Sequence, residues 1–262
     1  MAEKPVEPAQ PTPEELTERL LNEARRLITS LQAAGRLNAI RPDGTVPVFY
    51  ADEAFDIALP YSDIDSTQMQ MLARRTAIDD TLMQQILDMV PSLKGRKLLD
   101  IGSYTGATAM MLHRFLTPDE THMFEPQNLM QDALATTIAK NPDTDNVTLH
   151  QTVIDGDGAS ITRNASRPER LAEVGYLRRE GGPITARSID SLGLDNIGMI
   201  HMDFGNTKLY ALEGAKQTIE RDRPVVIVDL AGRDANEIRD FFEPFDYENQ
   251  RVGRHAMMFL PK

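Results

Sequence analysis

A carboxylate and two glycines lie close together in residues 98–106, between an apolar run and the start of a helical pattern. Asp100 and Gly102 end the apolar run, and Gly106 precedes the helical pattern. Glycine is needed where the backbone must adopt a positive φ or approach a ligand closely. Ligands of open α/β proteins bind at the carboxyl ends of the strands. This stretch therefore predicts a ligand-binding turn between a strand and a helix.

The turn differs from a dinucleotide-binding loop at one position. Tyr104 stands where the fingerprint G-x-G-x-x-G has its middle glycine, and a side chain there hinders close approach of a pyrophosphate. S-adenosylmethionine carries no phosphate, and its cationic groups suit the carboxylate of Asp100. We therefore expect S-adenosylmethionine as the cofactor. The turn residues expected to contact it are Asp100, Gly102, Ser103, Tyr104, Thr105 and Gly106.

Two further acidic residues follow the next two predicted strands. Glu125 ends the second strand, where a carboxylate can accept hydrogen bonds from both ribose hydroxyls, and Pro126 comes directly after it. Asp155 follows the third strand, where its side chain could accept from the adenine amine. Residues 155–158 read Asp-Gly-Asp-Gly, which is equally typical of a turn. Both interpretations of Asp155 stay open.

Asp203 and Asp229 end two later strands and are candidates for the acceptor side of the site. Methyl transfer needs an aligned acceptor, and a hydroxyl acceptor must also lose its proton. Asp203 could act directly as the base, or Asp203 and Asp229 together could hold a divalent metal such as Mg²⁺. Asp229 could equally cap a helix. His201, two residues before Asp203, faces the same side of the sheet as a second catalytic candidate or as a hydrogen-bonded core residue.

Short apolar runs alternating with helical patterns must position these residues. The expected strands are 97–101, 121–124, 147–153, 197–202 and 224–230. The expected helices are 107–115, 129–140, 208–220 and 236–242. Such alternation indicates a parallel, doubly wound α/β sheet. Two final runs, 246–252 and 255–260, are expected to form an antiparallel hairpin that closes it.

The remaining segments divide the chain into three predicted parts. Residues 1–13 are rich in proline and are expected to form a disordered leader. Residues 14–93 form a helical cap, and residues 94–262 form the S-adenosylmethionine-binding domain. Within the cap we expect an amphipathic helix from 13 to 34, loops or a small hairpin over 36–60, and a second helical region over 66–90.

Residues 155–187 form a long excursion between two strands, with no clear period and a helical part near 167–174. Excursions of this length are often functional lids. We expect this excursion and residues 36–90 to cover the methyl acceptor. Arg74 and Arg75 are the expected anchors in the first of these segments along the chain.

The order of motifs resembles the FkbM-type family of class I methyltransferases over residues 94–262. The resemblance implies a Rossmann-like seven-stranded sheet, S-adenosylmethionine as cofactor, and O-methylation of a sugar or secondary metabolite. The segment 203–208 reads Asp-Phe-Gly-Asn-Thr-Lys where the family has Asp-x-Glu-Gly-x-Glu, so two acids are absent. The matching motifs are residues 99–102 with Gly106, then 124–126, 188–192, 200–203, 212–215 and 224–229.

The composition limits the partners of the protein. The formal net charge is −12, and such a surface repels nucleic acids and anionic membranes. The sequence contains no cysteine, which excludes disulfides and thiolate chemistry. We expect a cytoplasmic protein with a small-molecule acceptor, and homo-oligomer formation stays open.

Two other functions compete with an O-methyltransferase. The altered segment 203–208 would suit a non-catalytic protein that binds S-adenosylmethionine and has a degenerate acceptor site. A nicotinamide-dependent oxidoreductase is disfavoured because the middle glycine is missing.

Overall fold

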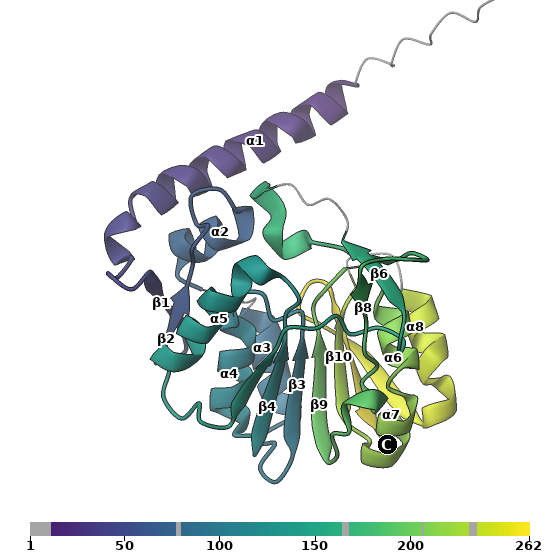
Figure 1. Ribbon diagram of the computed structural model, residues 1–262. Helices are drawn as coiled ribbons and strands as arrows, with labels where there is room; N and C mark the ends of the chain where they lie inside the picture. Colours follow the sequence, from purple (N-terminus) through teal and green to yellow (C-terminus); the bar gives the residue numbers. More distant parts are fainter. Residues whose placement is uncertain (1–11, 77–79, 164–167, 206, 231–234) are drawn as a thin grey trace, which may run out of the picture.

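The computed structural model describes residues 12–76, 80–163, 168–205, 207–230 and 235–262. Its central sheet has seven strands in the order β5-β4-β3-β9-β10-β12-β11 (Figure 1). Neighbouring strands are parallel except where β12 pairs with β10 and β11. This order confirms the predicted class I methyltransferase sheet with its closing hairpin. The strands are β3 (Lys97–Ile101), β4 (Glu120–Phe124), β5 (Val147–His150), β9 (Ile197–Met202), β10 (Val225–Asp229), β11 (Tyr247–Val252) and β12 (Ala256–Pro261).

Helices cover both faces of the sheet, because successive side chains of a buried strand point to opposite faces. Leu98 of β3 lies in the core beneath α3, α4 and α5, and Leu99 lies in the core beneath α6, α7 and α8. Figure 1 shows the two groups of helices on either side of the sheet. The helices are α3 (Asp80–Met89), α4 (Ala107–Leu116), α5 (Asn128–Lys140), α6 (Lys208–Glu213), α7 (Lys216–Asp222) and α8 (Ala235–Phe242).

Two helical regions predicted as continuous are broken. The region 66–90 contains α2 (Ser66–Arg74) and α3, because Arg75 adopts a left-handed conformation with φ 58° and ends α2. The region 208–220 contains α6 and α7, which are separated at Gly214. A Cβ atom on Gly214 would lie 2.8 Å from the carbonyl oxygen of Asp155, so the backbone approaches its neighbour closely there.

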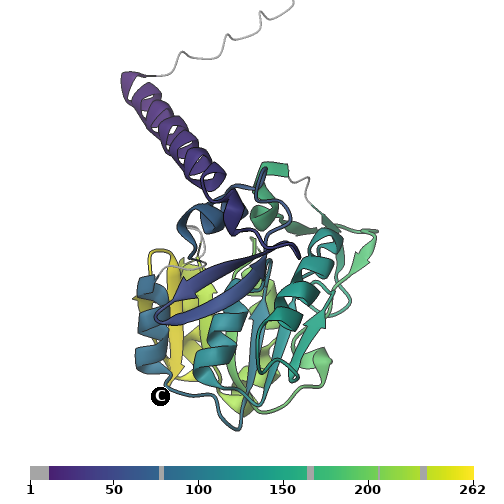
Figure 2. The ribbon, with the colours of Figure 1, turned by 90° about the vertical axis from the view of Figure 1, so that its left-hand side faces the viewer.

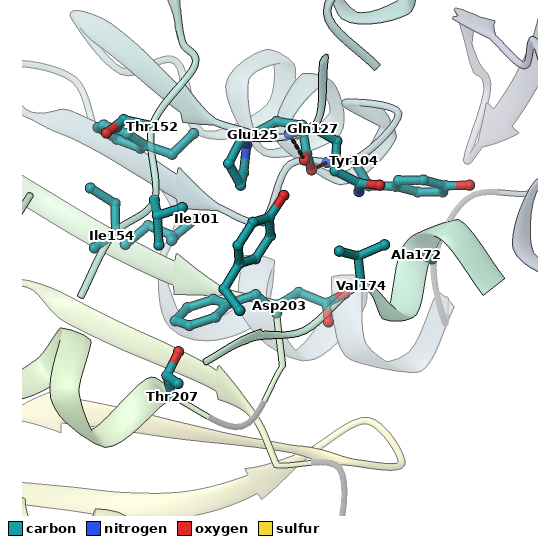
Figure 3. Close-up of a pocket in the computed structure, with 16 residues that line it drawn as sticks. Ile101, Tyr104, Glu125, Gln127, Thr152, Ile154, Ala172, Val174, Asp203 and Thr207 are labelled. Carbon is teal, nitrogen blue, oxygen red and sulfur yellow. Dashed lines mark hydrogen bonds between the residues drawn. The ribbon is translucent and has the colours of Figure 1, made fainter. Parts of the chain in front are cut away.

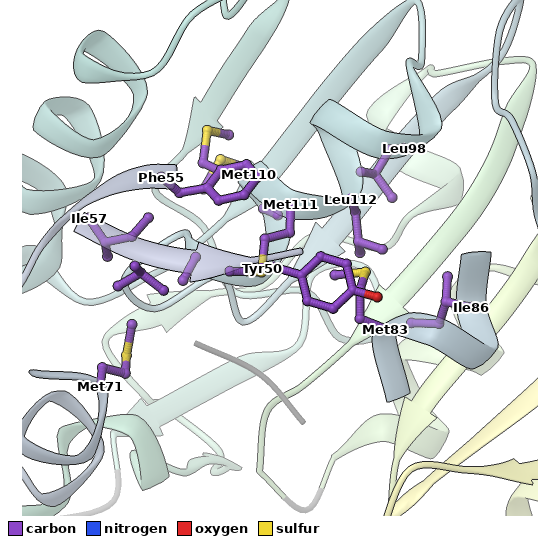
Figure 4. Close-up of a cluster of buried hydrophobic side chains, with 14 of the residues drawn as sticks. Tyr50, Phe55, Ile57, Met71, Met83, Ile86, Leu98, Met110, Met111 and Leu112 are labelled. Carbon is purple, nitrogen blue, oxygen red and sulfur yellow. The ribbon is translucent and has the colours of Figure 1, made fainter. Parts of the chain in front are cut away.

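The first 60 residues contribute a projecting helix and a hairpin. Helix α1 (Pro13–Ala34) extends away from the body of the protein, as Figures 1 and 2 show. The strands β1 (Thr45–Tyr50) and β2 (Glu53–Ala58) pair as the predicted small hairpin, which packs on α4 and α5. Hairpin side chains such as Phe55 and Ile57 join the same buried cluster as Met110 and Met111 of α4 (Figure 4).

The excursion before β9 contains more regular structure than the sequence predicts. Strands β6 (Ser160–Arg163), β7 (Tyr176–Arg178) and β8 (Ile184–Thr185) form a small antiparallel sheet. The 3₁₀ helix η2 (Pro168–Glu173) accounts for the helical part that was expected. These strands have two to four residues, too few to show a period of two. We call residues 160–163 and 168–185 the arm.

Three short 3₁₀ helices complete the described secondary structure: η1 (Leu37–Ala39), η3 (Asp190–Leu192) and η4 (Glu243–Phe245). Residues 1–11, most of the predicted leader, lie outside the described residues. Among the helices that are described, none combines the length and the apolar character needed to cross a membrane.

Candidate active site

Two cavities meet at the carboxyl ends of the central strands, and Asp203 lines both. The first cavity lies over β3 and β4, where Gly102, Glu125 and Pro126 line it. The second lies over β9 and β10, where His201 and Asp229 line it. The sheet edge therefore brings together most of the predicted residues and separates them into two groups.

Glu125 is held at the first cavity by the backbone of two loops. It is 3% exposed, and it accepts hydrogen bonds from the N–H of Tyr104 at 3.0 Å and of Gln127 at 2.8 Å (Figure 3). Burial, with a smaller contribution from the nearby charge of Asp100, raises the pKa of Glu125 to about 7 against the effect of these hydrogen bonds. Its carboxylate is thus fixed in position beside the predicted cofactor turn.

Gly102 allows two parts of the chain to touch. It has a φ of 87°, and a Cβ atom on it would lie 2.1 Å from the carbonyl oxygen of Asp203. The N–H of Asp203 also donates to the carbonyl oxygen of Ile101 at 3.0 Å. From the sequence, Gly102 is expected to let a ligand approach the backbone closely. In the structure, the backbone of Asp203, directly after β9, is what approaches Gly102.

Asp100 points towards His201. The two residues are partners in the parallel register of β3 and β9, and His201 Nδ1 lies 2.6 Å from Asp100 Oδ1. Both side chains are buried, and Asp100 Oδ2 has no hydrogen-bond partner among the described residues. Burial lowers the pKa of His201, but the hydrogen bond to Asp100 and the charges of Asp100, Asp203 and Asp229 outweigh burial and raise it overall.

The other side chains of the cofactor turn contact the protein itself. Ser103 Oγ donates to the carbonyl oxygen of Asp100 at 3.0 Å, and Tyr104 Oη donates to Asp65 Oδ1 at 2.6 Å. Thr105 is buried and, like Ser103 and Gly106, lines neither cavity. Gly106 has a φ of 80° at the start of α4, which explains the second glycine of the motif. Among these four turn residues, Tyr104 is the one that lines the first cavity.

Asp155 is fully buried and is paired with the arm. Its Oδ1 accepts hydrogen bonds from Arg178 Nε at 2.8 Å and Nη2 at 2.6 Å, and the N–H of Gly156 also donates to it. The Arg178 guanidinium lies 3.7 Å from the centre of the Tyr210 ring. The turn interpretation and the acceptor interpretation of Asp155 are compatible, because Oδ2 is buried without a hydrogen-bond partner among the described residues.

The arm closes the first cavity. Ala172, Val174 and Tyr176 line it, and Figure 3 shows Ala172 and Val174 facing Ile101 and Glu125 across it. Burial, together with the charge of Glu125, raises the pKa of Tyr176 to about 12. The remaining space of about 40 Å³ is far below the roughly 300–1,000 Å³ of a typical ligand pocket. The arm must therefore move before a nucleoside can enter.

The second cavity is open, with a volume of about 640 Å³, and the cap lines its outer wall. Arg74 of α2 and Leu82 of α3 lie on this wall. The arm lines the first cavity and not the second, and its role as a cover for the acceptor stays a prediction. Arg75 is not an anchor: its Nε donates to the carbonyl oxygen of Pro47 at 3.0 Å, and its guanidinium lies 4.6 Å from the centre of the Phe49 ring.

The predicted metal site is not formed by the described residues. Asp203 and Asp229 both line the second cavity, but within the described ranges no group of three or more His, Cys, Asp or Glu could hold a metal ion. Asp203 is an exposed residue that lines both cavities. Loss of hydration around its carboxyl group and the nearby charges of Asp229 and Asp100 raise its pKa. The described residues therefore offer no set of three such ligands for Mg²⁺, and no step is assigned to a metal.

Other residues near the carboxyl ends of the strands do fit S-adenosylmethionine. Three side-chain oxygens of the described residues are buried without a hydrogen bond: Asp100 Oδ2, Gln127 Oε1 and Asp155 Oδ2. All three follow or end strands on the cofactor edge. Buried acceptors without partners are costly, and each such atom in a native structure needs an explanation. S-adenosylmethionine would offer an ammonium group, ribose hydroxyls and an adenine amine as donors.

Sequence reasoning missed several residues that shape this region. Asp65 caps α2, and it accepts hydrogen bonds from the hydroxyl of Tyr104 and from the N–H of Leu171, the latter at 2.7 Å. It therefore connects the cap, the cofactor turn and the arm. Its position before Ser66 and Thr67 is a helix-start signal that could have identified it. Gln127 carries no comparable signal in the sequence.

No family model matches the sequence, and no curated protein matches it. Among solved structures, the chain is similar to the methyltransferase FkbM of Methylobacillus flagellatus KT, with 16% identity, a TM-score of 0.49, and 91% of this chain and 60% of that chain covered. The chain thus spans 60% of the length of that protein. It is also similar to TYW2 of M. jannaschii in complex with AdoMet, with 11% identity, a TM-score of 0.44, and coverage of 82% and 85%. A third similar structure is a SAM-dependent methyltransferase from Aquifex aeolicus, with 12% identity, a TM-score of 0.42, and coverage of 68% and 87%.

Proposed function

We propose that the protein is an S-adenosylmethionine-dependent methyltransferase that acts on a hydroxyl group of a small molecule. The observation that supports it most strongly is the arrangement of the two cavities. They share Asp203 at the carboxyl edge of the sheet, and Gln127, whose Oε1 is buried without a hydrogen-bond partner among the described residues, lines the first cavity. A cofactor in one cavity and an acceptor in the other would meet at that residue.

Four groups on the first side would bind the cofactor. Glu125 would accept hydrogen bonds from the ribose, and Asp100 Oδ2 would accept one from the ammonium group. Asp155 Oδ2 would accept from the adenine amine once the arm has moved. Ile101 and Ile154, which line the first cavity, would offer apolar surface to the adenine ring. When bound, S-adenosylmethionine supplies an activated methyl group on a sulfonium.

The second cavity would hold the acceptor next to a proton acceptor. Of the carboxylate and imidazole groups on its wall, His201 and Asp203 are the candidates for taking a hydroxyl proton. The open volume of about 640 Å³ suits a sugar or a secondary metabolite. The net charge of −12 disfavours a nucleic-acid acceptor.

Turnover tests this proposal. The purified chain should convert S-adenosylmethionine to S-adenosylhomocysteine when incubated with extracts of hydroxylated metabolites, and isotopic label from the cofactor methyl should appear in a product. His201→Gln/Asp203→Asn, which changes both candidate proton acceptors, serves as the matched control and should form no product. Cofactor binding without turnover over a broad set of acceptors would contradict the proposal and support a non-catalytic binding protein.

A further inference from the structure

We propose that Asp100 is a positioning residue that holds His201 in a single tautomer, with Nε2 ready to accept the proton of the acceptor hydroxyl. The inference rests on the proposed function and deepens it, because it assigns the base and the residue that orients it. From the sequence, Asp100 is expected to contact the cofactor, and His201 is either a catalytic candidate or a hydrogen-bonded core residue.

The geometry of the pair carries the inference. Asp100 and His201 face each other in the register of β3 and β9, and 2.6 Å separates Oδ1 from Nδ1. Asp100 is 1% exposed and His201 is 4% exposed, so water competes little for this hydrogen bond. The backbone of Asp100 is fixed as well, since its carbonyl oxygen accepts from Ser103 Oγ. The carboxylate therefore has one orientation relative to the ring.

The charge state of a carboxylate determines which ring nitrogen carries the proton. An ionised Asp can only accept, so the hydrogen bond to Asp100 requires a proton on Nδ1 of His201. In the neutral ring Nε2 then has a free lone pair. His201 lines the second cavity, and within the described residues its ring forms its one hydrogen bond through Nδ1. Nε2 is thus left for a molecule in that cavity.

Asp203 does not have a comparable arrangement. It lies at the boundary of both cavities, and no side chain among the described residues orients its carboxylate through a hydrogen bond. Burial raises its pKa, which favours the neutral acid and weakens it as a neighbour that could orient a second group. Of these two residues, His201 is the one whose side chain is held by a hydrogen bond to a buried carboxylate.

In the proposed step the acceptor oxygen loses a proton and gains a methyl group. The hydroxyl proton of the acceptor passes to Nε2 of His201, which becomes an imidazolium stabilised by the carboxylate of Asp100. The freed oxygen lone pair forms the new bond to the methyl carbon. The electron pair of the broken carbon–sulfur bond stays on sulfur, which changes from a sulfonium to a neutral thioether. Solvent later removes the proton from Nε2.

Nitrogen NMR of the imidazole rings tests the tautomer without any turnover. The full-length chain would be labelled with ¹⁵N-histidine, and the signal of His201 would be assigned by its loss in His201→Gln. We expect Nδ1 protonated and Nε2 bare at a pH above the His201 titration. Asp100→Asn offers the ring both a donor and an acceptor, so the single tautomer should be lost. Asp203→Asn, the matched control, should leave the tautomer unchanged.

Kinetics at saturating cofactor give the second readout. Both Asp100→Asn and His201→Gln should lower kcat by about 100-fold or more, the usual range for a general base. The double variant should be no slower than the slower single variant, because the residues act as one unit. A proton on Nε2 in the neutral wild-type ring, or an unchanged tautomer in folded Asp100→Asn, would overturn the inference. If no acceptor is ever methylated, the NMR result still decides the tautomer, and only the proposed function fails.

Discussion

A Cβ atom on Gly102 would lie 2.1 Å from the carbonyl oxygen of Asp203, so the cofactor turn and the segment after β9 are in direct contact. This contact places the shared residue of both cavities beside the turn. Its consequence is that a change at the turn disturbs the acceptor side as well as the cofactor side.

Gly102→Ala should destabilise the protein more than the same change at a glycine with free space around it. Gly193, with φ 69° and no atom within 4 Å of an added Cβ, is the matched control. Gly193→Ala should cost about 1–2 kcal/mol for the left-handed backbone alone. Gly102→Ala adds the steric conflict with Asp203 and should cost roughly 3 kcal/mol or more. Urea unfolding measures both, and equal losses would contradict the proposed contact.

Glu125 should make cofactor affinity depend on pH. Its pKa of about 7 means that the acid form is populated near neutrality, and ribose hydroxyls donate better to the carboxylate. Affinity should therefore rise as the pH increases from 6 to 8, and Glu125→Gln should bind more weakly, by about tenfold, with a flat pH profile. Calorimetry with S-adenosylhomocysteine measures this. A wild-type affinity that falls with pH would contradict the role of Glu125.

The same raised pKa affects folding with a definite sign. Because folded Glu125 keeps its proton to a higher pH than the unfolded chain, its contribution to stability is present below pH 4.5 and is lost as the pH rises through about 7. Glu125→Gln removes this titration. Its free energy of unfolding should therefore fall less than that of the wild type between pH 5 and pH 8.

Turnover should become slower at low pH, because His201 is then protonated and cannot act as a base. The groups that face it are Asp100 on β3, Asp203 after β9 and Asp229 on β10, and together they raise its pKa against the effect of burial. A base must be unprotonated, so kcat should increase with pH through a midpoint above 6.5. Asp100→Asn should move this midpoint down, because a negative charge beside the ring is lost. Glu125→Gln, measured at saturating cofactor, should leave the midpoint in place; an unchanged midpoint in Asp100→Asn would be the contradicting result.

The arm should open through the ion pair of Arg178 with Asp155. Arg178→Ala leaves a fully buried carboxylate without its partner and should cost on the order of 1–3 kcal/mol, with faster thermolysin cleavage within residues 160–185. Adding Asp155→Asn should recover part of the stability, since the buried charge is gone. S-adenosylhomocysteine should change the cleavage rate of the wild-type arm. If neither Arg178→Ala nor S-adenosylhomocysteine changes the cleavage rate, the arm is not the gate of the first cavity.

The centre of the sheet could be predicted closely from the sequence because β3, β9 and β10 are apolar runs buried on both faces. The predicted bounds of β3 and β9 agree with the structure at both ends. The break at Arg75 could not be predicted, since a non-glycine residue adopts the left-handed conformation there while the apolar period continues into α3. The three strands of the arm are too short to produce a pattern.

The acidic residues of the candidate site could be predicted from the sequence, but their hydrogen-bond partners could not. Asp100, Glu125 and Asp203 were identified because Asp100 lies near the end of a strand at the ligand-binding edge and the other two directly follow one. The pairing of Asp100 with His201 depends on the register between β3 and β9, which are far apart in the chain. The pairing of Asp155 with Arg178 likewise depends on how the arm folds back. Such contacts are properties of the tertiary structure and leave no local signal.

Calorimetric titration of the purified chain with S-adenosylmethionine and S-adenosylhomocysteine tests the central claim most directly. We predict saturable binding of both ligands at one site, weaker binding by Glu125→Gln, and no binding of NAD. Absence of a binding signal with either sulfur ligand, in protein shown by circular dichroism to be folded, would contradict the account.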